Sequence, residues 1–329
     1  MTMPVTQCLI KLHEEHHALE DYQGGVPRWC SGCGDNAILA AVQRLCRDED
    51  LAPERTVFVS GIGCSSRLPH YMKTYGFHGI HGRAFPIAEG VKMARPDLAV
   101  FVNTGDGDCC SIGAAHWIHA LRYNMNLTVI LHDNHVYGLT KKQASPTSPR
   151  GLKSNTTPRG STLEALNPLT VTLGVTNVSF VAQAVDWIPE LLYDIISKAY
   201  HHRGFSFVRI IQRCPEFLPK MFEPWLHDPG KTLLLSHANG LAISPELART
   251  YTNTIGHDPA DIDRAREIAS SEDPIPVGIL YHNPNVPCYE DLRNAGQMRT
   301  VDQIRAGFEA ELDKFTVWPQ GEADARRAA

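Results

Sequence analysis

Short apolar runs that end in glycine-rich loops recur along this sequence as far as Cys214. "RTVFVSGIGCSS" (residues 55–66), "LAVFVNTGDGD" (98–108) and "LTVILHDNHVYG" (127–138) are each typical of a buried strand that opens into a tight loop. "VSFVAQA" (178–184) and "FSFVRIIQRC" (205–214) indicate two further strands. Segments with apolar residues at helical spacing lie around them, at 35–48, 81–95, 109–124 and 186–202. The alternation predicts an α/β fold, a doubly wound parallel sheet with helices on both faces and Asp35 as the cap of the first helix.

The character of the sequence changes after Cys214. "CPEFLPKMFEPWLHDPG" is rich in proline, and the residues that follow mix a few helix-like segments with loops. We expect residues 1–214 to form the sheet domain. Residues 215–329 are expected to form an irregular C-terminal extension that wraps the core or a partner subunit.

The composition excludes several classes of function. The chain has 329 residues, a formal net charge of -5 and no excess of basic residues, which argues against nucleic acid as a partner. No apolar run is long enough to cross a membrane. The first residues lack the features of a signal peptide, and nine cysteines without such a signal favour reduced thiols over a disulfide framework. We therefore expect a cytoplasmic protein without membrane association.

Two polar residues stand at the ends of neighbouring predicted strands. Asp106 lies in the loop "GDGD", and Asn134 follows the next strand in "HDNHVYG". The carboxyl ends of parallel strands meet at one edge of a sheet, so these side chains should lie side by side. Together with a backbone carbonyl near Val136 they form a set of oxygen ligands that suits Mg²⁺ bound to a diphosphate. The alternative is that "GDGD" is only a turn and Asn134 only a cap.

The cysteines leave several kinds of site open. Cys30 and Cys33 form a C-x2-C pair, which could be a redox dithiol, part of a zinc site or part of an iron–sulfur site. No further pair of ligands with zinc spacing follows. Cys64 and Cys214 instead stand at two strand ends, and four thiolates at one end of a sheet suit a [4Fe–4S] cluster. Cys109 is expected to be packed in the core, as is its neighbour Cys110.

Several of these motifs together resemble a known family. "GIGCSSR", "HGRA", "GDGD", "IHALRYN" and "DNHVYGLTKKQASPTSP" are similar to the β subunit of 2-oxoacid:ferredoxin oxidoreductases, over about residues 29–214. The resemblance implies that Asp106, Asn134 and the carbonyl of Val136 bind Mg²⁺. One position departs from many thiamine enzymes, because His135 stands where a second asparagine is common. The resemblance also assigns the four cluster ligands, which are Cys30, Cys33, Cys64 and Cys214.

The same resemblance implies further contacts with thiamine diphosphate. These fall on Gly63, Ser65, His81, Gly105, Asp106, Gly107, Asp108, Asn134, Val136, Gly138, Leu139 and Thr140. Arg67 and Lys141 are loop cations near the same strand ends. They are candidates for binding the substrate or another anion, and the alternative is that they are solvated loop charges.

The resemblance implies a reaction and a partner. Members oxidise a 2-oxo acid with coenzyme A and ferredoxin, and the glutamate that activates thiamine is expected on a separate α subunit, in an (αβ)₂ assembly. The C-terminal segment, with "SSEDPIPVGILYHN", looks more like the 2-oxoglutarate members than the pyruvate members. Two rival functions remain. A non-redox thiamine decarboxylase or synthase would leave the four cysteines without a role, and an iron–sulfur carrier would leave the metal loop without one.

Overall fold

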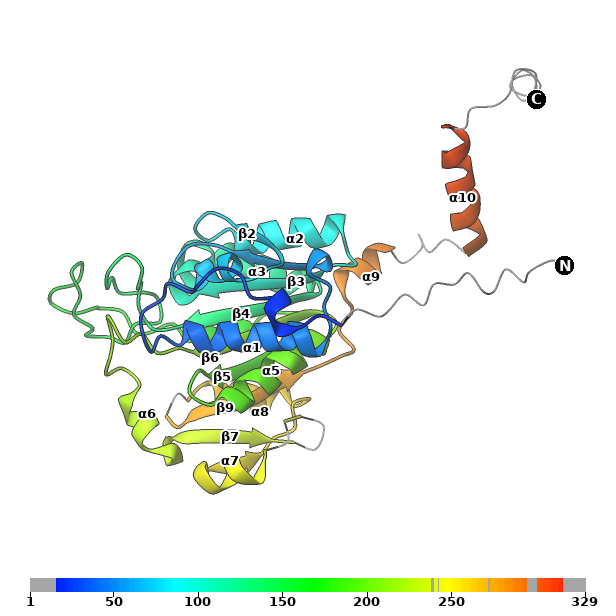
Figure 1. Cartoon of the computed structure of the whole chain (residues 1–329). Helices are drawn as coiled ribbons and strands as arrows, with labels where there is room; N and C mark the ends of the chain where they lie inside the picture. Colours follow the sequence, from blue (N-terminus) through cyan, green and yellow to red (C-terminus); the bar gives the residue numbers. More distant parts are fainter. Residues whose placement is uncertain (1–15, 238–239, 242, 272, 295–300, 316–329) are drawn as a thin grey trace, which may run out of the picture. The chain divides into compact units, whose positions relative to one another are not determined.

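The computed structural model describes residues 16–237, 240–241, 243–271, 273–294 and 301–315 (Figure 1). The chain divides into a large unit, Met1–Glu290, and a small one, Asp291–Ala329. The small unit contains helix α10 (Val301–Asp313), and helix α9 (Tyr289–Asn294) lies at the division. Among the described helices, none has the length and apolar character required to cross a bilayer. The site discussed below belongs to the large unit.

A nine-stranded sheet forms the centre of the large unit. Each pair of neighbouring strands is parallel, except for β5 and β9, which are antiparallel. Five central strands are buried along almost their whole length, as expected for a sheet covered on both faces. In spatial order the strands are β2 (Tyr75–His78), β1 (Thr56–Ser60), β3 (Ala99–Gly105), β4 (Leu127–Asp133), β6 (Phe205–Ile211), β5 (Phe180–Val185), β9 (Ile275–His282), β7 (Thr232–Ser236) and β8 (Thr254–Gly256).

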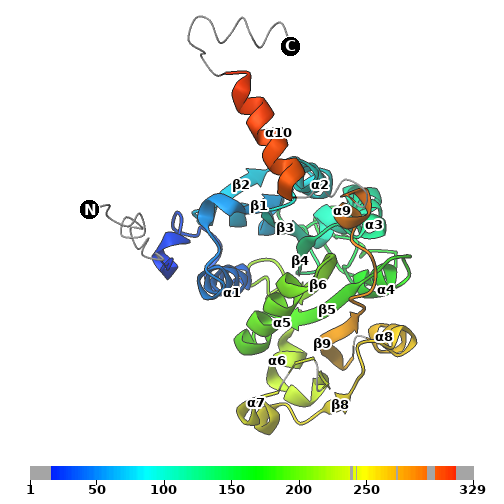
Figure 2. The same ribbon diagram turned by 90° about the vertical axis from the view of Figure 1, so that its right-hand side faces the viewer.

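Helices cover both faces of this sheet, which confirms the doubly wound α/β fold (Figures 1 and 2). Alternate residues of β1 show the division: Phe58 packs in one core, whereas Val57 and Val59 pack in the other. The core around Phe58 includes helices α1 (Asp35–Asp48) and α5 (Pro189–His201). The opposite core includes α2 (Ala84–Ala94), α3 (Ala114–Tyr123), α4 (Pro168–Leu173) and α8 (Ile262–Ala269).

The segment after Cys214 is more regular than the sequence indicated. It adds β7, β8 and β9 to the same sheet, together with the short helices α6 (Glu223–His227) and α7 (Pro245–Thr250), so the large unit continues to Glu290. These strands were missed because a proline-rich stretch precedes β7 and because β8 and helix α7 are short. The expected domain boundary at Cys214 is therefore corrected. Contact of this segment with a partner subunit stays a prediction.

Local structure differs from expectation at the start of α1. Gly34, not Asp35, occupies the capping position, and no side chain caps the helix. The Asp35 carboxylate instead accepts a hydrogen bond from Nδ1 of His132, at 2.7 Å. Both side chains are buried, and a buried ring N–H needs an acceptor. Shorter helical segments connect the main elements: η2 (Leu19–Asp21), η3 (Pro53–Arg55), η4 (Ser65–Tyr71), the π-helical η5 (Asp108–Ile112) and η6 (Pro229–Lys231).

A buried histidine makes the stability of this fold depend on pH. His202 is 5% exposed, its Nε2 lies 2.8 Å from the Ser179 hydroxyl, and burial followed by the neighbouring His282 lowers its pKa to about 4. The unfolded chain therefore binds more protons than the folded chain between about pH 4 and about pH 6.5. Stability should fall as the pH drops through this window. At pH 5, His202 should lower the free energy of unfolding by about 2 kcal/mol relative to neutral pH.

Urea unfolding at pH 7.5 and pH 5 tests this with a His202→Gln variant, which keeps a polar side chain that does not titrate. The variant should lose less stability between the two pH values than the wild type. Equal losses in the two proteins would contradict the assignment.

Candidate functional site

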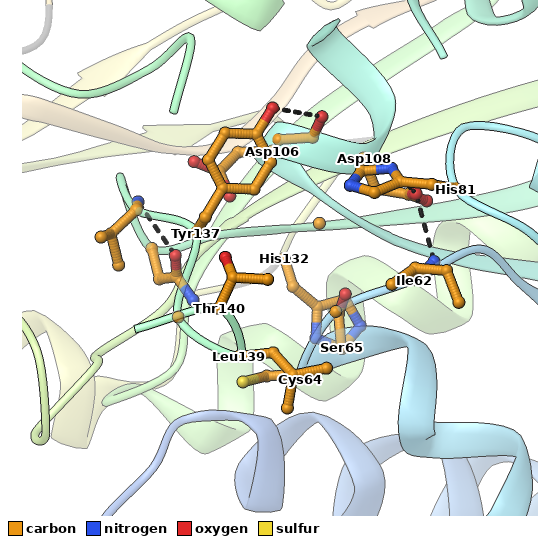
Figure 3. Close-up of a pocket in the computed structure, with 16 residues that line it drawn as sticks. Ile62, Cys64, Ser65, His81, Asp106, Asp108, His132, Tyr137, Leu139 and Thr140 are labelled. Carbon is orange, nitrogen blue, oxygen red and sulfur yellow. Dashed lines mark hydrogen bonds and ion pairs between the residues drawn. The ribbon is translucent and has the colours of Figure 1, made fainter. Parts of the chain in front are cut away.

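Four loops, at the carboxyl ends of β1, β2, β3 and β4, surround one pocket (Figure 3). Every residue that the sequence assigned to the cofactor lines this pocket. Cys64, Ser65 and Leu139 lie together on one side, and Asp108 with His81 on another. The cavity volume of the pocket is about 40 Å³. Its lining also includes Ile62, Cys64, His132 and Tyr137, which the sequence did not assign to the cofactor.

The Asp106 carboxylate is buried beside a second carboxylate. Its Oδ2 accepts hydrogen bonds from the hydroxyls of Ser145 and Thr147, the latter at 2.7 Å. Thr147 also lies 2.7 Å from Oδ1 of Asp133. Burial, and then the charge of Asp133, raise the pKa of Asp106 to about 7. A buried carboxylate beside a like charge is stabilised by a cation, and a divalent ion fits this donor set.

Asp133 is neutralised by the protein itself. Arg209 Nε donates to its Oδ2 at 2.7 Å, and both side chains are buried. Although burial opposes ionisation, Arg209 and then His135 keep the pKa of Asp133 below its ordinary value. Asp133 is therefore a fixed negative charge, and Asp106 is the carboxylate left to meet a cation.

Asn134 and Val136 form the opposite part of the expected metal site. Asn134 Oδ1 accepts a hydrogen bond from the backbone N–H of Val136 at 3.1 Å, which places this oxygen within the same turn as the Val136 carbonyl. His135 between them has a φ of 61°. Asn, Asp and His are enriched in this left-handed region, so histidine is a suitable replacement for the asparagine common at this position.

Asp108 connects the loops that form the pocket. Its carboxylate accepts hydrogen bonds from the backbone N–H groups of Ile62 at 3.1 Å and Gly82 at 2.7 Å, and from the Thr104 hydroxyl at 2.8 Å. Nδ1 of His81 lies 2.8 Å from the same carboxylate. The carboxylate of Asp108 thus holds the pocket wall in place, and its contact with a cofactor stays a prediction.

Close packing explains two glycines of the pocket motifs. A Cβ atom at Gly61 would lie 2.0 Å from the Asp108 carboxylate, and one at Gly107 would lie 2.1 Å from the Tyr137 ring. Ser65 nearby is 4% exposed, and its hydroxyl has no hydrogen-bond partner among the described residues. A buried hydroxyl without a partner in a pocket wall is suited to a polar ligand.

The four cysteines expected to bind a cluster meet beside this pocket. The Cys30–Cys33 turn adjoins the end of β6, because the Gly34 N–H donates to the Arg213 carbonyl at 3.2 Å. Cys64 follows β1 and Cys214 follows β6. A Cβ atom at Gly138 would lie 3.4 Å from Sγ of Cys64 and 3.9 Å from Sγ of Cys214, so the two thiols flank a glycine of the pocket.

The electrostatics of these thiols indicate that they are close together. Burial raises the pKa of Cys64 to about 12, with further contributions from Asp35, Cys214 and Cys30. The pKa of Cys33 is also raised, by burial, then Asp35, and in smaller part Cys64. Such thiols lose their protons when metal binds.

Four cysteine thiols are the donor set that a [4Fe–4S] cluster takes. Among the described residues, no group of three or more His, Cys, Asp or Glu side chains is arranged to hold a metal ion. Cys109 and Cys110 are buried in the core, as expected.

The two candidate cations lie outside the enclosed pocket. Arg67 Nη1 donates to the Arg28 carbonyl at 3.3 Å, and its charge acts on the Cys64 thiol. Lys141 directly follows the pocket residue Thr140, is exposed and has a φ of 72°. Both could meet a ligand that extends out of the pocket.

Comparison with known proteins agrees with this geometry. The model of the C-terminal TPP-binding domain of thiamine pyrophosphate enzymes matches residues 61–210, and that of the C-terminal part of the pyruvate ferredoxin oxidoreductase β subunit matches residues 248–296. A 2-oxoacid:ferredoxin oxidoreductase β subunit from Sulfolobus is 37% identical over 84% of this chain and 89% of its own length. The chain belongs to the family of 2-oxoacid:ferredoxin oxidoreductase β subunits.

Two further members of this family are named for 2-oxoglutarate. The 2-oxoglutarate oxidoreductase subunit KorB of Mycobacterium tuberculosis is 49% identical over 60% of this chain, and the match spans 52% of that protein's length. The 2-oxoglutarate:ferredoxin oxidoreductase of Magnetococcus marinus, whose structure holds 2-oxoglutarate, coenzyme A and succinyl-CoA, superimposes with a TM-score of 0.72 at 33% identity. That match covers 95% of this chain and 97% of the other. The expected family, fold class and thiamine-dependent type of enzyme are thereby confirmed.

The carboxylate pair predicts opposite effects of one substitution on stability and on binding. Asp106→Asn removes one of two adjacent buried charges, so at about pH 8 the ligand-free variant should melt at the same temperature as the wild type or higher. The variant lacks the charged metal ligand, so the rise in melting temperature caused by Mg²⁺ with thiamine diphosphate should disappear.

Thermal melting with and without these ligands measures both effects. Asp263→Asn, which changes a carboxylate side chain that is 87% exposed, is the matched control and should keep the ligand-induced rise. The same rise in the Asp106→Asn variant would show that Asp106 does not bind the metal.

Proposed function

We propose that this chain binds thiamine diphosphate–Mg²⁺ and a [4Fe–4S] cluster in an enzyme that converts 2-oxoglutarate and coenzyme A to succinyl-CoA and CO₂, with ferredoxin as electron acceptor. The observation that carries the proposal is the wall shared by the two sites. Cys64 and Gly138 line the thiamine pocket. A Cβ atom at Gly138 would lie 3.4 Å from Sγ of Cys64 and 3.9 Å from Sγ of Cys214, so this glycine lies beside both sulfurs. Two redox groups held this closely would exchange electrons directly, in either direction of the reaction.

Different residues of the pocket would have different roles in binding thiamine diphosphate. Asp106, Asn134 and the Val136 carbonyl would hold Mg²⁺, for which their oxygens are suited. The Ser65 hydroxyl would bind the cofactor's diphosphate, since it is buried without another partner. Asp108 would keep the surrounding loops in place through its hydrogen bonds to them.

The four cysteine thiolates would bind the cluster, one to each iron. When bound, thiamine diphosphate supplies an electron sink for decarboxylation of a 2-oxo acid, and the cluster supplies a one-electron outlet. The chain's own contribution would be to place the two groups on either side of one thin wall. Cys214 is buried there, Cys33 and Cys64 are partly buried, and Cys30 is exposed.

We propose that the active site is completed by another subunit. Thiamine enzymes need a glutamate against the aminopyrimidine ring, and no glutamate lines the pocket in the described part of the chain. An α subunit would supply this glutamate, and the pair would form a symmetric (αβ)₂ assembly. We also propose that this enzyme is cytoplasmic, because the eight described cysteines are free thiols.

The choice of 2-oxoglutarate rests on relatives and on charge. Two relatives named above carry 2-oxoglutarate in their names. A second substrate carboxylate would need a cation once water is excluded, and Arg67 or Lys141 at the pocket's edge could provide it. Pyruvate, which lacks this carboxylate, is the alternative substrate.

Purification of the chain together with its α subunit, under anaerobic conditions, allows a direct test of this function. The pair should reduce ferredoxin or a low-potential dye only when coenzyme A is present, and faster with 2-oxoglutarate than with pyruvate. The chain alone, supplied with thiamine diphosphate, Mg²⁺ and coenzyme A, should be inactive. Comparable turnover by the chain alone would contradict the shared site, and preference for pyruvate would contradict the substrate.

Variants of the two cations refine the test of substrate choice. Arg67→Ala or Lys141→Ala should lower kcat/KM for 2-oxoglutarate about tenfold or more, the value of one charged hydrogen bond, with a smaller effect on pyruvate. Lys142→Ala changes the neighbouring, partly buried lysine and should affect neither substrate. An equal loss with both acids would assign the cations to coenzyme A or the cofactor.

A further inference from the structure

One buried side chain connects the metal site to the cluster site. Gln212 follows β6 and is 1% exposed. Its Oε1 accepts a hydrogen bond from Nδ2 of Asn134 at 3.0 Å. Its Nε2 donates to Sγ of Cys33 at 3.2 Å. A single amide therefore contacts an expected Mg²⁺ ligand at one end and an expected cluster ligand at the other.

The orientations of both amides are fixed by backbone groups. Nε2 of Gln212 also donates to the Arg213 carbonyl, which can only accept, so the nitrogen must be on that side. Oδ1 of Asn134 accepts from the Val136 N–H, which can only donate. With these ends determined, the oxygen of Gln212 meets the nitrogen of Asn134, and the nitrogen of Gln212 meets the sulfur of Cys33.

The link has a consequence at each end. Because Nδ2 of Asn134 is held by Gln212, its Oδ1 remains turned toward the Val136 loop, where the ion would bind. At the other end, an N–H donated to a cluster sulfur stabilises the extra negative charge of the reduced cluster and raises its reduction potential. The Asp35 carboxylate, 3.4 Å from the same sulfur, acts in the opposite sense, so Gln212 offsets a nearby negative charge.

We propose that Gln212 is a positioning residue for both cofactors, which orients Asn134 toward Mg²⁺ and raises the reduction potential of the cluster through Cys33. This inference rests on the proposed function, since it requires that the chain hold both groups. It assigns a role to a residue between the strand "FSFVRII" and Cys214 that lies in neither ligand motif.

Two variants of Gln212 separate its two contacts. Gln212→Met replaces the amide with a side chain of similar volume that neither donates nor accepts a hydrogen bond. Half-saturation with thiamine diphosphate should then need about tenfold more Mg²⁺, and the midpoint potential of the cluster should fall. Gln212→Glu keeps an oxygen for Asn134 and loses the N–H to sulfur. The Mg²⁺ requirement should then stay closer to that of the wild type, while the potential falls.

The measurements are calorimetric titration of thiamine diphosphate at stepped Mg²⁺ concentrations and a redox titration followed by paramagnetic resonance, both on the anaerobic αβ complex. Gln43→Met changes another buried glutamine, which bonds to the backbone of Tyr22 and Tyr71, and should alter neither quantity.

Unchanged potentials and Mg²⁺ requirements in both Gln212 variants would overturn the inference, as would equal changes in the Gln43→Met control. If the methionine variant does not assemble, the glutamate variant decides on the potential alone. A wild-type complex whose chain holds no iron would instead refute the proposed function itself, so the two failures are distinguishable.

Discussion

The parallel direction of the central strands brings the chemistry of this chain to one edge of the sheet. β1, β3, β4 and β6 all run the same way, so the loops that follow them lie next to one another. Those loops carry Cys64, Asp106, Asn134 and Cys214, and the Cys30–Cys33 turn joins them through the Gly34 contact to Arg213. The thiamine pocket and the cysteine group are neighbours because this topology leaves them a common edge.

Charge balance then determines what that edge can hold. Asp133 is paired with Arg209, whereas Asp106 is bonded to hydroxyl groups and faces Asp133 across the Thr147 hydroxyl. Among the described side chains that hydrogen-bond to Asp106, none carries a positive charge that would offset its negative charge. Burial raises the pKa of Asp106, and a divalent ion at this place would stabilise its charged form.

The sequence predicts the central strands and the loops that follow them, because each depends on a local pattern, whereas the ligand roles of these loops stay predictions. Apolar runs followed by glycines identify β1, β3 and β4, and their parallel direction implies the shared edge. The supporting contacts are different, because they join residues far apart in the chain. Asp35 and His132 are separated by 97 positions, and Cys33 and Gln212 by 179. Asp108 shows the same limit, since a motif gives the residue but not the direction in which its carboxylate points.

The central claim is that the cluster and the thiamine site belong to the same chain. Anaerobic purification of this chain without its partner, followed by iron and acid-labile sulfide analysis and paramagnetic resonance of the reduced protein, tests it directly. The account predicts about four iron atoms per chain in the wild type and in the Cys109→Ser variant. In the Cys214→Ser variant the cluster should be lost or should convert to a three-iron form. A chain that holds no iron alone or in the complex, or equal damage in both variants, would contradict it.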